Sequence, residues 1–275
     1  MAIAEPLLHE LHDRARERGV DGYRRMSKTE LLQALGAVEA GPTTVESAVR
    51  AGLGVLTLRG GGENALSLET LEQLADAAEA LAADANVRLV AVTGAGARIF
   101  SSGADLKALK DLSGDEVAGR GGAALARLAA LEVPTVALLN GHVVGGGIDL
   151  ALACDWRVAV EGAKLRFIHN ELGFTPPWGA LGRLVSLVSP QIALRLFATC
   201  ELVSAQEARQ MGVVDDVVAP HKLMSRAESL AVRIGRADRH AVTETKRLLR
   251  PGIPYEEHAR TVAALWDARP ATLTQ

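Results

Sequence analysis

The chain has 275 residues, a formal net charge of −3, and 48% apolar but only 3% aromatic residues. This length suffices for one large α/β domain with a small appendage. The slight negative charge argues against a general attraction to nucleic acid or to an anionic membrane. The two cysteines, Cys154 and Cys200, are too few for a disulfide scaffold and form no CxxC pair, so we expect free buried thiols and no metal site.

The N-terminal segment MAIAEPLLHELHDRARERG lacks the apolar region of a signal peptide, so we expect a cytoplasmic location. A membrane span is not expected either, because the apolar stretch 123–139 is broken by Arg127, Glu132 and Pro134.

Residues 1–42 differ from the rest of the chain. Two segments, LLHELHDRARERGV and SKTELLQALGAVEA, show helical apolar spacing, and Ser27 with Glu30 forms a capping box before the second. Gly41-Pro42 marks a boundary. The pattern predicts a helical hairpin over 1–42, joined to the main body by Thr43–Gly52.

The main body, 43–220, alternates strand and helix. A strand at Gly54–Leu58, a helix at Leu68–Ala83 capped by Ser67, and a strand at Val87–Thr93 predict a parallel pair with a right-handed crossover. We expect a mobile loop at 111–120. The alternation then continues with a helix at Gly121–Leu131, a strand at Thr135–Leu139, a helix from about Gly147, and a strand at Trp156–Val160.

The last part of the chain, 221–275, is predicted to be a C-terminal helical region. Its helices are expected at Leu223–Ile234, Ala241–Leu249 and Tyr255–Trp266.

Two segments rich in small residues carry the candidate chemistry: FSSGADL at 100–106 and NGHVVGGGIDL at 140–150. Each lies between a predicted strand and a predicted helix, and small residues let a ligand approach the backbone closely. The helix near Gly147 would point its N–H groups at that ligand. The sequence has no phosphate-binding GxxxxGK[ST], no complete dinucleotide fingerprint and no GxSxG elbow.

Together with AKLRFIHNELGFTPPWGALGRL and SAQEARQMGVVDDVV, these segments resemble the crotonase (enoyl-CoA hydratase/isomerase) superfamily from about Gly54 onward. The resemblance implies an α/β spiral of ββα turns, a C-terminal helical trimerisation region, and a homotrimer or hexamer. It implies a coenzyme A thioester as substrate and no cofactor. The backbone N–H groups of Ala104 and Gly146 would form an oxyanion hole, with Gly103 and Gly145 against the substrate and Ser102 beside the adenine.

A hydratase of this superfamily needs two carboxylates near the acyl carbons. Aligned with the family pattern, the first position is Asp149 and the second is His169, while Glu171 is out of register by two residues. The RFIH stretch and Trp178 resemble the ethylmalonyl-CoA and methylmalonyl-CoA decarboxylase branch, although Asp149 replaces the Glu usual there. This resemblance implies decarboxylation of a 2-alkylmalonyl thioester.

In this hypothesis, His169 orients the substrate carboxylate or delivers a proton, and Asp149 positions His169 or shapes the pocket. Trp178 forms a pocket wall or belongs to the core. Two alternatives stay open: a hydratase or isomerase with rearranged acid/base residues, and a non-catalytic member or one docked to an acyl-carrier protein.

The segment LHDRARERGVDGYRRMSKTELLQAL resembles the small N-terminal helical module of transcription terminator Rho. Its basic residues are offset by acidic ones, so nucleic-acid binding is weakly supported, and a docking or oligomer-contact role is an alternative.

Other polar residues are expected to be structural. Asp105 is predicted to cap a helix, Asp155 to pair with Arg157 or with a neighbouring subunit, Asp215-Asp216 to form a solvated turn, and Lys246-Arg247 to lie on an exposed helix face.

Overall fold

The computed structural model describes residues 8–17, 20, 22–26, 30–31, 42–61, 63–250 and 252–268. Its larger sheet has six strands in the order β1-β2-β3-β5-β7-β10. The strand β1 runs antiparallel to β2, and every other neighbouring pair is parallel. The strands are β1 (Thr44–Arg50), β2 (Leu53–Arg59), β3 (Leu89–Gly94), β5 (Thr135–Leu139), β7 (Trp156–Val160) and β10 (Asp216–Val218).

A second sheet is built from short strands that follow the long ones. β3 is followed by β4, β5 by β6, and β7 by β8, so the chain winds as a spiral of repeated ββα units. The strands β4, β6, β8 and β9 lie side by side in that order. Their bounds are β4 (Ile99–Ser101), β6 (His142–Val144), β8 (Lys164–Arg166) and β9 (Leu202–Ser204).

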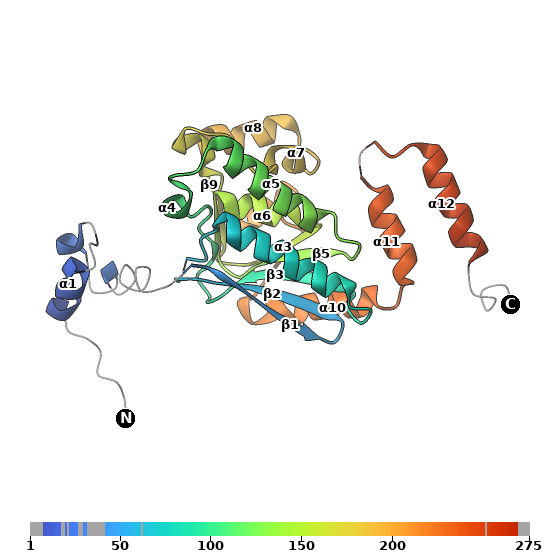
Figure 1. Ribbon diagram of the computed structural model, residues 1–275, viewed down its shortest axis with the longest axis horizontal. Coiled ribbons are helices and arrows are strands. Elements are labelled where there is room, and N and C mark those ends of the chain that lie inside the picture. Colours follow the sequence, from blue (N-terminus) through green and yellow to red (C-terminus); the bar gives the residue numbers. More distant parts are fainter. Residues whose placement is uncertain are drawn as a thin grey trace, which may run out of the picture.

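Helices cover both faces of the larger sheet (Figure 1). α3 (Leu68–Ala83) and α5 (Gly114–Ala129) lie side by side on one face, and α10 (Leu223–Ile234) packs on the other. α3 buries a stripe of apolar residues at helical spacing, including Leu68, Leu71 and Leu74. Each buried leucine contributes about 1.5–3 kcal/mol relative to an exposed one, so this stripe attaches the helix to the sheet.

The remaining helices lie around this body. They are α1 (Leu8–Glu17), α4 (Leu106–Leu109), α6 (Gly146–Ala153), α7 (Ala180–Val185), α8 (Pro190–Thr199), α9 (Ala205–Gln210), α11 (Arg239–Leu248), α12 (Tyr255–Asp267) and the 3-10 helices η1 (Tyr23–Arg25), η2 (Ile168–Leu172) and η3 (Pro220–Lys222).

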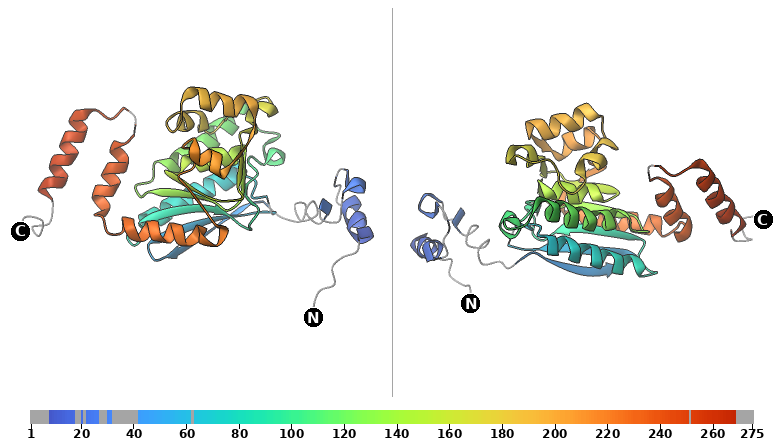
Figure 2. Two further views of the ribbon diagram at one scale, coloured as in Figure 1. Left: turned by 180° about the vertical axis from the view of Figure 1, so that it is seen from behind. Right: turned by 45° about the horizontal axis from the view of Figure 1, so that its top comes forward.

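Basic side chains attach the helix α11 and the residues after it to the body. Arg239 donates to the carbonyl groups of Ala82 and Asp84 at the end of α3, and Arg250 donates to the carbonyl of Ala130 at the end of α5. The last carbonyls of a helix lack intrahelical donors and carry partial negative charge, so they accept cations favourably. α12 follows α11 as an antiparallel neighbour, farther from the sheets in Figure 2.

Most predicted elements are confirmed, and two predictions are wrong. The segment Thr43–Gly52, expected as a connection, contains the strand β1. Most side chains of β1 face solvent, so it lacks the alternation of apolar and polar residues that would have indicated a strand. The expected loop at 111–120 contains the first two turns of α5. Ser113 caps this helix and forms a capping box with Glu116, a signal present in the sequence.

The N-terminal module has a small apolar core of its own. Leu11, Ala15 and Leu31 are buried together, and Val20, Tyr23 and Met26 pack against them. The first predicted helix is confirmed as α1, whereas Ser27 and most of the second helix lie outside the described residues. The likeness to the Rho module stays a prediction. Within the described ranges, no helix is long and apolar enough to cross a membrane.

Candidate active site

The two segments of small residues lie directly against each other. A Cβ on Gly103 would lie 2.7 Å from the carbonyl oxygen of Val144 and 2.8 Å from the nitrogen of Gly146. Gly103 has φ +96° and Gly145 has φ +50°, a region that side-chain-bearing residues rarely adopt. Glycine is therefore required at Gly103 by contact and by conformation, and at Gly145 by conformation.

This packing leaves two backbone donors close together. The backbone N–H of Leu66 donates to the carbonyl of Gly103, and the carbonyl of Leu66 accepts from the N–H of Asp105. The N–H of Ala104, which lies between these two bonds, is left without an acceptor in them. Gly146 is the first residue of α6, where no intrahelical acceptor exists. Over the described ranges, neither N–H has a hydrogen-bond acceptor. The Ala104 nitrogen is 3.1 Å from the Cβ position of Gly146.

Two adjacent free N–H groups at a helix N-terminus are suited to hold an oxygen that becomes negatively charged. Ala104 and Gly146 lie together, and their role as an oxyanion hole stays a prediction. We refer to these two donors as the hole.

A cavity with a volume of about 390 Å³ lies beside Ala104, one of the two donors. Its wall includes Ser102 and Ala104, two of the residues expected at the site. Asp149, His169 and Trp178 do not line it. The lining residues are Pro42, Thr43, Gly60, Gly61, Glu63, Ala65, Ser102, Ala104, Asp105, Leu106 and Lys107.

Asp149 and His169 form a buried pair that does not line this cavity. Nε2 of His169 lies 2.9 Å from Oδ2 of Asp149, and their side chains are 2% and 0% exposed. The distance is that of an ion pair, but the ring N–H direction does not give an aligned hydrogen bond. Nδ1 of His169 has no hydrogen-bond partner in the part of the chain that the structure describes.

The second oxygen of Asp149 has a structural role that the sequence did not indicate. Oδ1 accepts hydrogen bonds of 3.2 Å from the backbone N–H groups of Trp178 and Ala180. These groups lie at the start of α7, whose own N-cap, Gly179, has no side chain to supply an acceptor. Asp149 therefore fixes the turn that carries Trp178.

Trp178 is 1% exposed and lies against the hole. Its ring atom Cζ3 is 2.4 Å from the position that a Cβ on Gly146 would take. Nε1 donates to the carbonyl of Val117 in α5, at 2.9 Å. Trp178 is therefore part of the core and a neighbour of the donor Gly146, and its role as a pocket wall stays a prediction.

Arg183 is a further residue of this site that was missed from the sequence. Its Nη1 donates to the carbonyl of Trp178 at 2.7 Å. Burial lowers the pKa of its guanidinium, and the charge of the nearby Asp149 opposes this shift. The spacing of Arg183 five residues after Trp178 gave no recognisable signal. Glu171, in contrast, is exposed and pairs with Arg166 at 2.7 Å.

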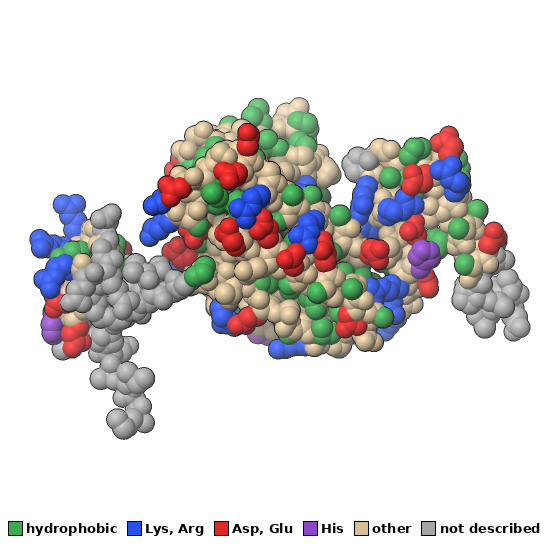
Figure 3. Space-filling model, in the orientation of Figure 1, with side chains coloured by type: hydrophobic (Ala, Val, Ile, Leu, Met, Phe, Trp, Pro, Cys, Tyr) green, Lys and Arg blue, Asp and Glu red, His purple; other side chains and the backbone are tan. Residues whose placement is uncertain are grey.

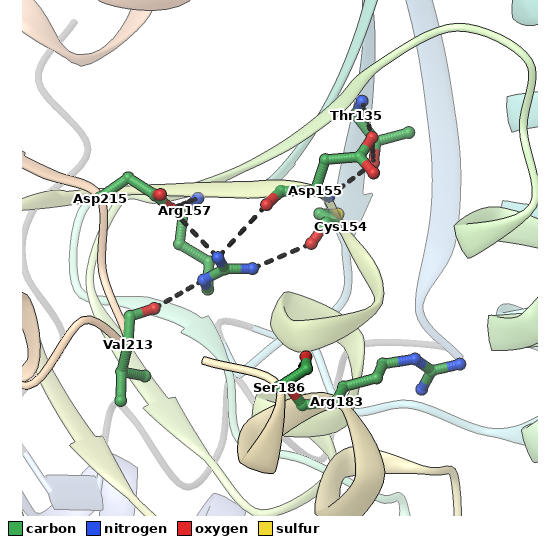
Figure 4. A network of polar contacts seen from close by, with 8 residues as sticks. All are labelled: Thr135, Cys154, Asp155, Arg157, Arg183, Ser186, Val213 and Asp215. Atoms are coloured by element: carbon green, nitrogen blue, oxygen red, sulfur yellow. Dashed lines mark hydrogen bonds and ion pairs between the residues drawn. The ribbon is translucent and has the colours of Figure 1, made fainter. Parts of the chain in front are cut away.

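Several polar residues outside the hole are structural, but not with the predicted partners (Figure 4). Asp105 caps α4, as expected. The Asp155 carboxylate pairs with Lys246 rather than with Arg157, at 2.7 Å. Lys246 is thus largely buried instead of exposed.

Arg157 is buried and pairs with Asp215, at 3.1 Å, and also donates to the carbonyl groups of Val213 and Cys154 (Figure 4). Asp216 pairs with Arg226 at 2.7 Å, so Asp215-Asp216 is not a solvated turn. Sequence spacing could not indicate these pairs because their partners are far apart along the chain. Both cysteines are free and buried. No group of three His, Cys, Asp or Glu side chains within the described ranges could hold a metal ion.

The ββα spiral with its C-terminal helices and its paired backbone donors defines the crotonase class of folds. Residues 48–264 match the family model described as enoyl-CoA hydratase/isomerase. A crotonyl-CoA hydratase of Syntrophomonas wolfei is 37% identical over 193 residues, which cover 69% of this chain and 74% of the relative. A carnitinyl-CoA dehydratase of Salmonella arizonae is 34% identical over 189 residues, covering 68% and 72%.

Solved structures agree with this assignment. DspI of Pseudomonas aeruginosa aligns with a TM-score of 0.78 and 28% identity, over 82% of this chain and 96% of that one. The chain therefore belongs to the enoyl-CoA hydratase/isomerase family, and it is an enzyme of the crotonase type.

Proposed function

We propose that this enzyme decarboxylates a 2-alkylmalonyl thioester of the ethylmalonyl- or methylmalonyl-CoA type. The observation that carries the proposal is the Asp149–His169 pair. At the two positions where a hydratase of this family carries carboxylates, the chain has one carboxylate and one buried imidazole, 2.9 Å apart. One oxygen of that carboxylate is already bound to two backbone N–H groups.

The proposed reaction needs few side chains. The thioester oxygen binds the N–H groups of Ala104 and Gly146, and the bond from C2 to the carboxylate breaks with release of carbon dioxide. The electron pair of this bond passes into the thioester as an enolate, whose oxygen the two donors stabilise. C2 then takes one proton in place of the lost carboxylate, and the product is a saturated acyl thioester that keeps the alkyl group. Water later restores the proton to the enzyme.

His169 supplies that proton in the proposal. An imidazole can hold and transfer a proton near neutral pH, and a contacting carboxylate fixes its orientation. The rings of Phe174 and Phe197 lie 6.0 and 5.7 Å from the His169 ring centroid, so the pair sits in apolar surroundings. Such surroundings disfavour a substrate carboxylate more than a delocalised enolate held by fixed dipoles.

The test is a panel of malonyl-, methylmalonyl- and ethylmalonyl-CoA, incubated with the enzyme and followed by mass spectrometry for loss of carbon dioxide. We expect turnover of at least one alkylated substrate and a strong decrease of this turnover in His169→Gln. Absence of decarboxylation across the panel would overturn the proposal.

Hydration of an enoyl-CoA is the second candidate, and the names of the relatives support it. Crotonyl-CoA hydratase and carnitinyl-CoA dehydratase are both similar to this chain at 34% identity or more. The loss of crotonyl-CoA absorbance on addition of enzyme measures this activity directly. Our proposal predicts that it is slow, because only one carboxylate occupies the acid/base positions.

We also propose that coenzyme A carries the acyl group and that the chain forms a homotrimer or hexamer. The exposed apolar residues Leu194 on α8, Leu249 directly after α11 and Val262 on α12 offer surface for contacts between copies. Figure 3 shows apolar side chains among charged ones over the C-terminal helices. Light scattering after size exclusion, with and without residues 1–42, would measure the assembly and the contribution of the N-terminal module.

A further inference from the structure

We infer that Trp178 limits the acyl group at the hole to a short one and so determines the chain-length specificity of the enzyme. The inference rests on the thioester site of the proposed function, but not on which reaction follows there.

The first argument is the position of the indole. The ring edge that carries Cζ3 and Cε3 lies at 2.4 and 3.2 Å from the Cβ position of Gly146, and the Ala104 nitrogen is 3.1 Å from the same point. The ring edge therefore lies directly beside the Gly146 donor, and in this inference it meets the acyl carbons of a thioester bound by both donors, beyond the cavity that Ala104 lines.

The second argument is that the indole is held from several sides. Nε1 donates to the carbonyl of Val117, the backbone N–H donates to Asp149, and the backbone carbonyl accepts from Arg183. All the polar groups of Trp178 are thus paired. Rotating the ring away from the hole would leave a buried donor unpaired, at a cost of about 1–3 kcal/mol.

The third argument is that the neighbouring helix is shaped to the ring. A Cβ on Gly121 of α5 would lie 2.2 Å from Nε1 and 2.6 Å from Cδ1 of Trp178. The indole is therefore wedged between Gly121 of α5 and Gly146 of α6. A ring enclosed between two backbones acts as a fixed wall, because close-packed interiors do not yield by an ångström.

A fixed wall at the reacting carbons separates substrates by length. Each methylene that a pocket cannot accept is worth roughly 10–200-fold in discrimination. We expect acetyl and butyryl groups to fit beside the indole and a hexanoyl or octanoyl group to require its displacement.

The experiment measures binding of unreactive saturated acyl-CoA thioesters by isothermal titration calorimetry. The series is acetyl-, butyryl-, hexanoyl- and octanoyl-CoA, with the full-length enzyme and the variants Trp178→Leu and Trp178→Phe. In the wild type we expect Kd to rise about tenfold or more between butyryl- and octanoyl-CoA, and in Trp178→Leu we expect that ratio to fall by a similar factor.

Trp156→Phe is the matched control. Trp156 lies at the start of β7 and lines a different groove, between the body and α11. The ratio of the Kd for octanoyl-CoA to the Kd for butyryl-CoA should therefore be the same in Trp156→Phe as in the wild type. The Phe variant keeps a ring but loses the bond to Val117, and an intermediate ratio is expected. If Trp178→Leu does not fold, the Phe variant decides the question.

A wild type that binds octanoyl-CoA as tightly as butyryl-CoA would overturn the inference. So would an unchanged ratio in folded variants of Trp178. This ratio of Kd values does not depend on the reaction. If the enzyme decarboxylates none of the malonyl thioesters, yet binds octanoyl-CoA more weakly than butyryl-CoA and loses this difference in Trp178→Leu, the proposed function is refuted and the inference stands.

Discussion

Two aspartates at opposite ends of α6 show how the same side chain serves structure and chemistry differently. Beyond the C-terminal end, Oδ2 of Asp155 accepts from the backbone N–H and the hydroxyl of Thr135 and from Lys246, at 2.7, 2.9 and 2.7 Å. In the first turn, Asp149 bonds two backbone N–H groups at 3.2 Å, and its other oxygen faces only His169.

The difference lies in what is left unpaired. Asp155 belongs to a saturated network, whose removal should affect stability alone. The Asp149–His169 pair is more deeply buried yet keeps Nδ1 of His169 without a partner in the described chain. Buried polar atoms are rarely left unpaired in folded proteins, so such a site points to function rather than to stability.

The strongest test of this comparison is a change at the hole itself. Gly146→Ala would place a Cβ 2.4 Å from Cζ3 of Trp178, which must displace either the indole or a donor. We expect kcat/KM for the thioester substrate to fall by about 10²–10³, the usual effect of losing one such donor. Gly162→Ala is the matched control, since nothing lies within 4 Å of its Cβ position. Full activity in Gly146→Ala would show that the hole is placed wrongly.

Removal of the imidazole is expected to have a comparable or smaller effect. His169→Gln keeps a polar side chain but cannot donate a proton, so we expect kcat to fall by about 10²–10⁴ while acyl-CoA binding stays within a few fold. His142→Gln is the control, because His142 only accepts a hydrogen bond from the backbone N–H of Lys164. A loss of binding in His169→Gln, with kcat retained, would assign the histidine to positioning of the substrate.

The network around Asp155, just after α6, is tested by Lys246→Met on α11. This change should lower the stability of the fold and leave kcat unchanged. The change removes the 2.7 Å pair with Asp155 and the bond to the carbonyl of Val133. We expect a loss of about 1–3 kcal/mol, and hence a fall of several degrees in Tm. Lys110→Met removes an exposed contact of 3.8 Å to Asp111 and should change Tm by little. Equal effects of the two variants would contradict the network.

The smallest expected effect concerns Cys154, next to Asp155. Burial raises the pKa of its thiol from an ordinary value of 9.0 to about 12. Between these values the unfolded chain loses the proton and the folded chain keeps it, so stability decreases as the pH rises from about 9 to 12. Urea unfolding across this range should show a steeper decline than in Cys154→Ala. Rapid alkylation of Cys154 in the native enzyme would contradict its burial.

The sequence was sufficient for the elements with regular periodicity and for bringing the two segments of small residues together. The bounds of α3, β5, β7 and α10 agree with the predicted ranges, because their apolar spacing and caps are local signals. The edge strand β1 was missed since most of its side chains are exposed and it carries no apolar alternation.

In the site, the sequence indicated the residues but not their bonds. The family pattern indicated both Asp149 and His169. It did not indicate the hydrogen bond by which Asp149 fixes the turn before α7, because the donor Trp178 is 29 residues away. Lys246 and Asp155 are 91 residues apart, and no local pattern records such a pairing. Residues that act through distant partners need the folded chain to be recognised.

Gly121 has a consequence for how this enzyme can vary. A glycine inside a helix costs about 1 kcal/mol relative to alanine, and here the indole of Trp178 occupies the space that the methyl group would need. Once Trp178 is made smaller, Gly121→Ala becomes sterically possible and should strengthen α5. We therefore expect the two positions to be coupled in selection experiments for longer substrates: the tryptophan changes first, and alanine at 121 is accepted only afterwards.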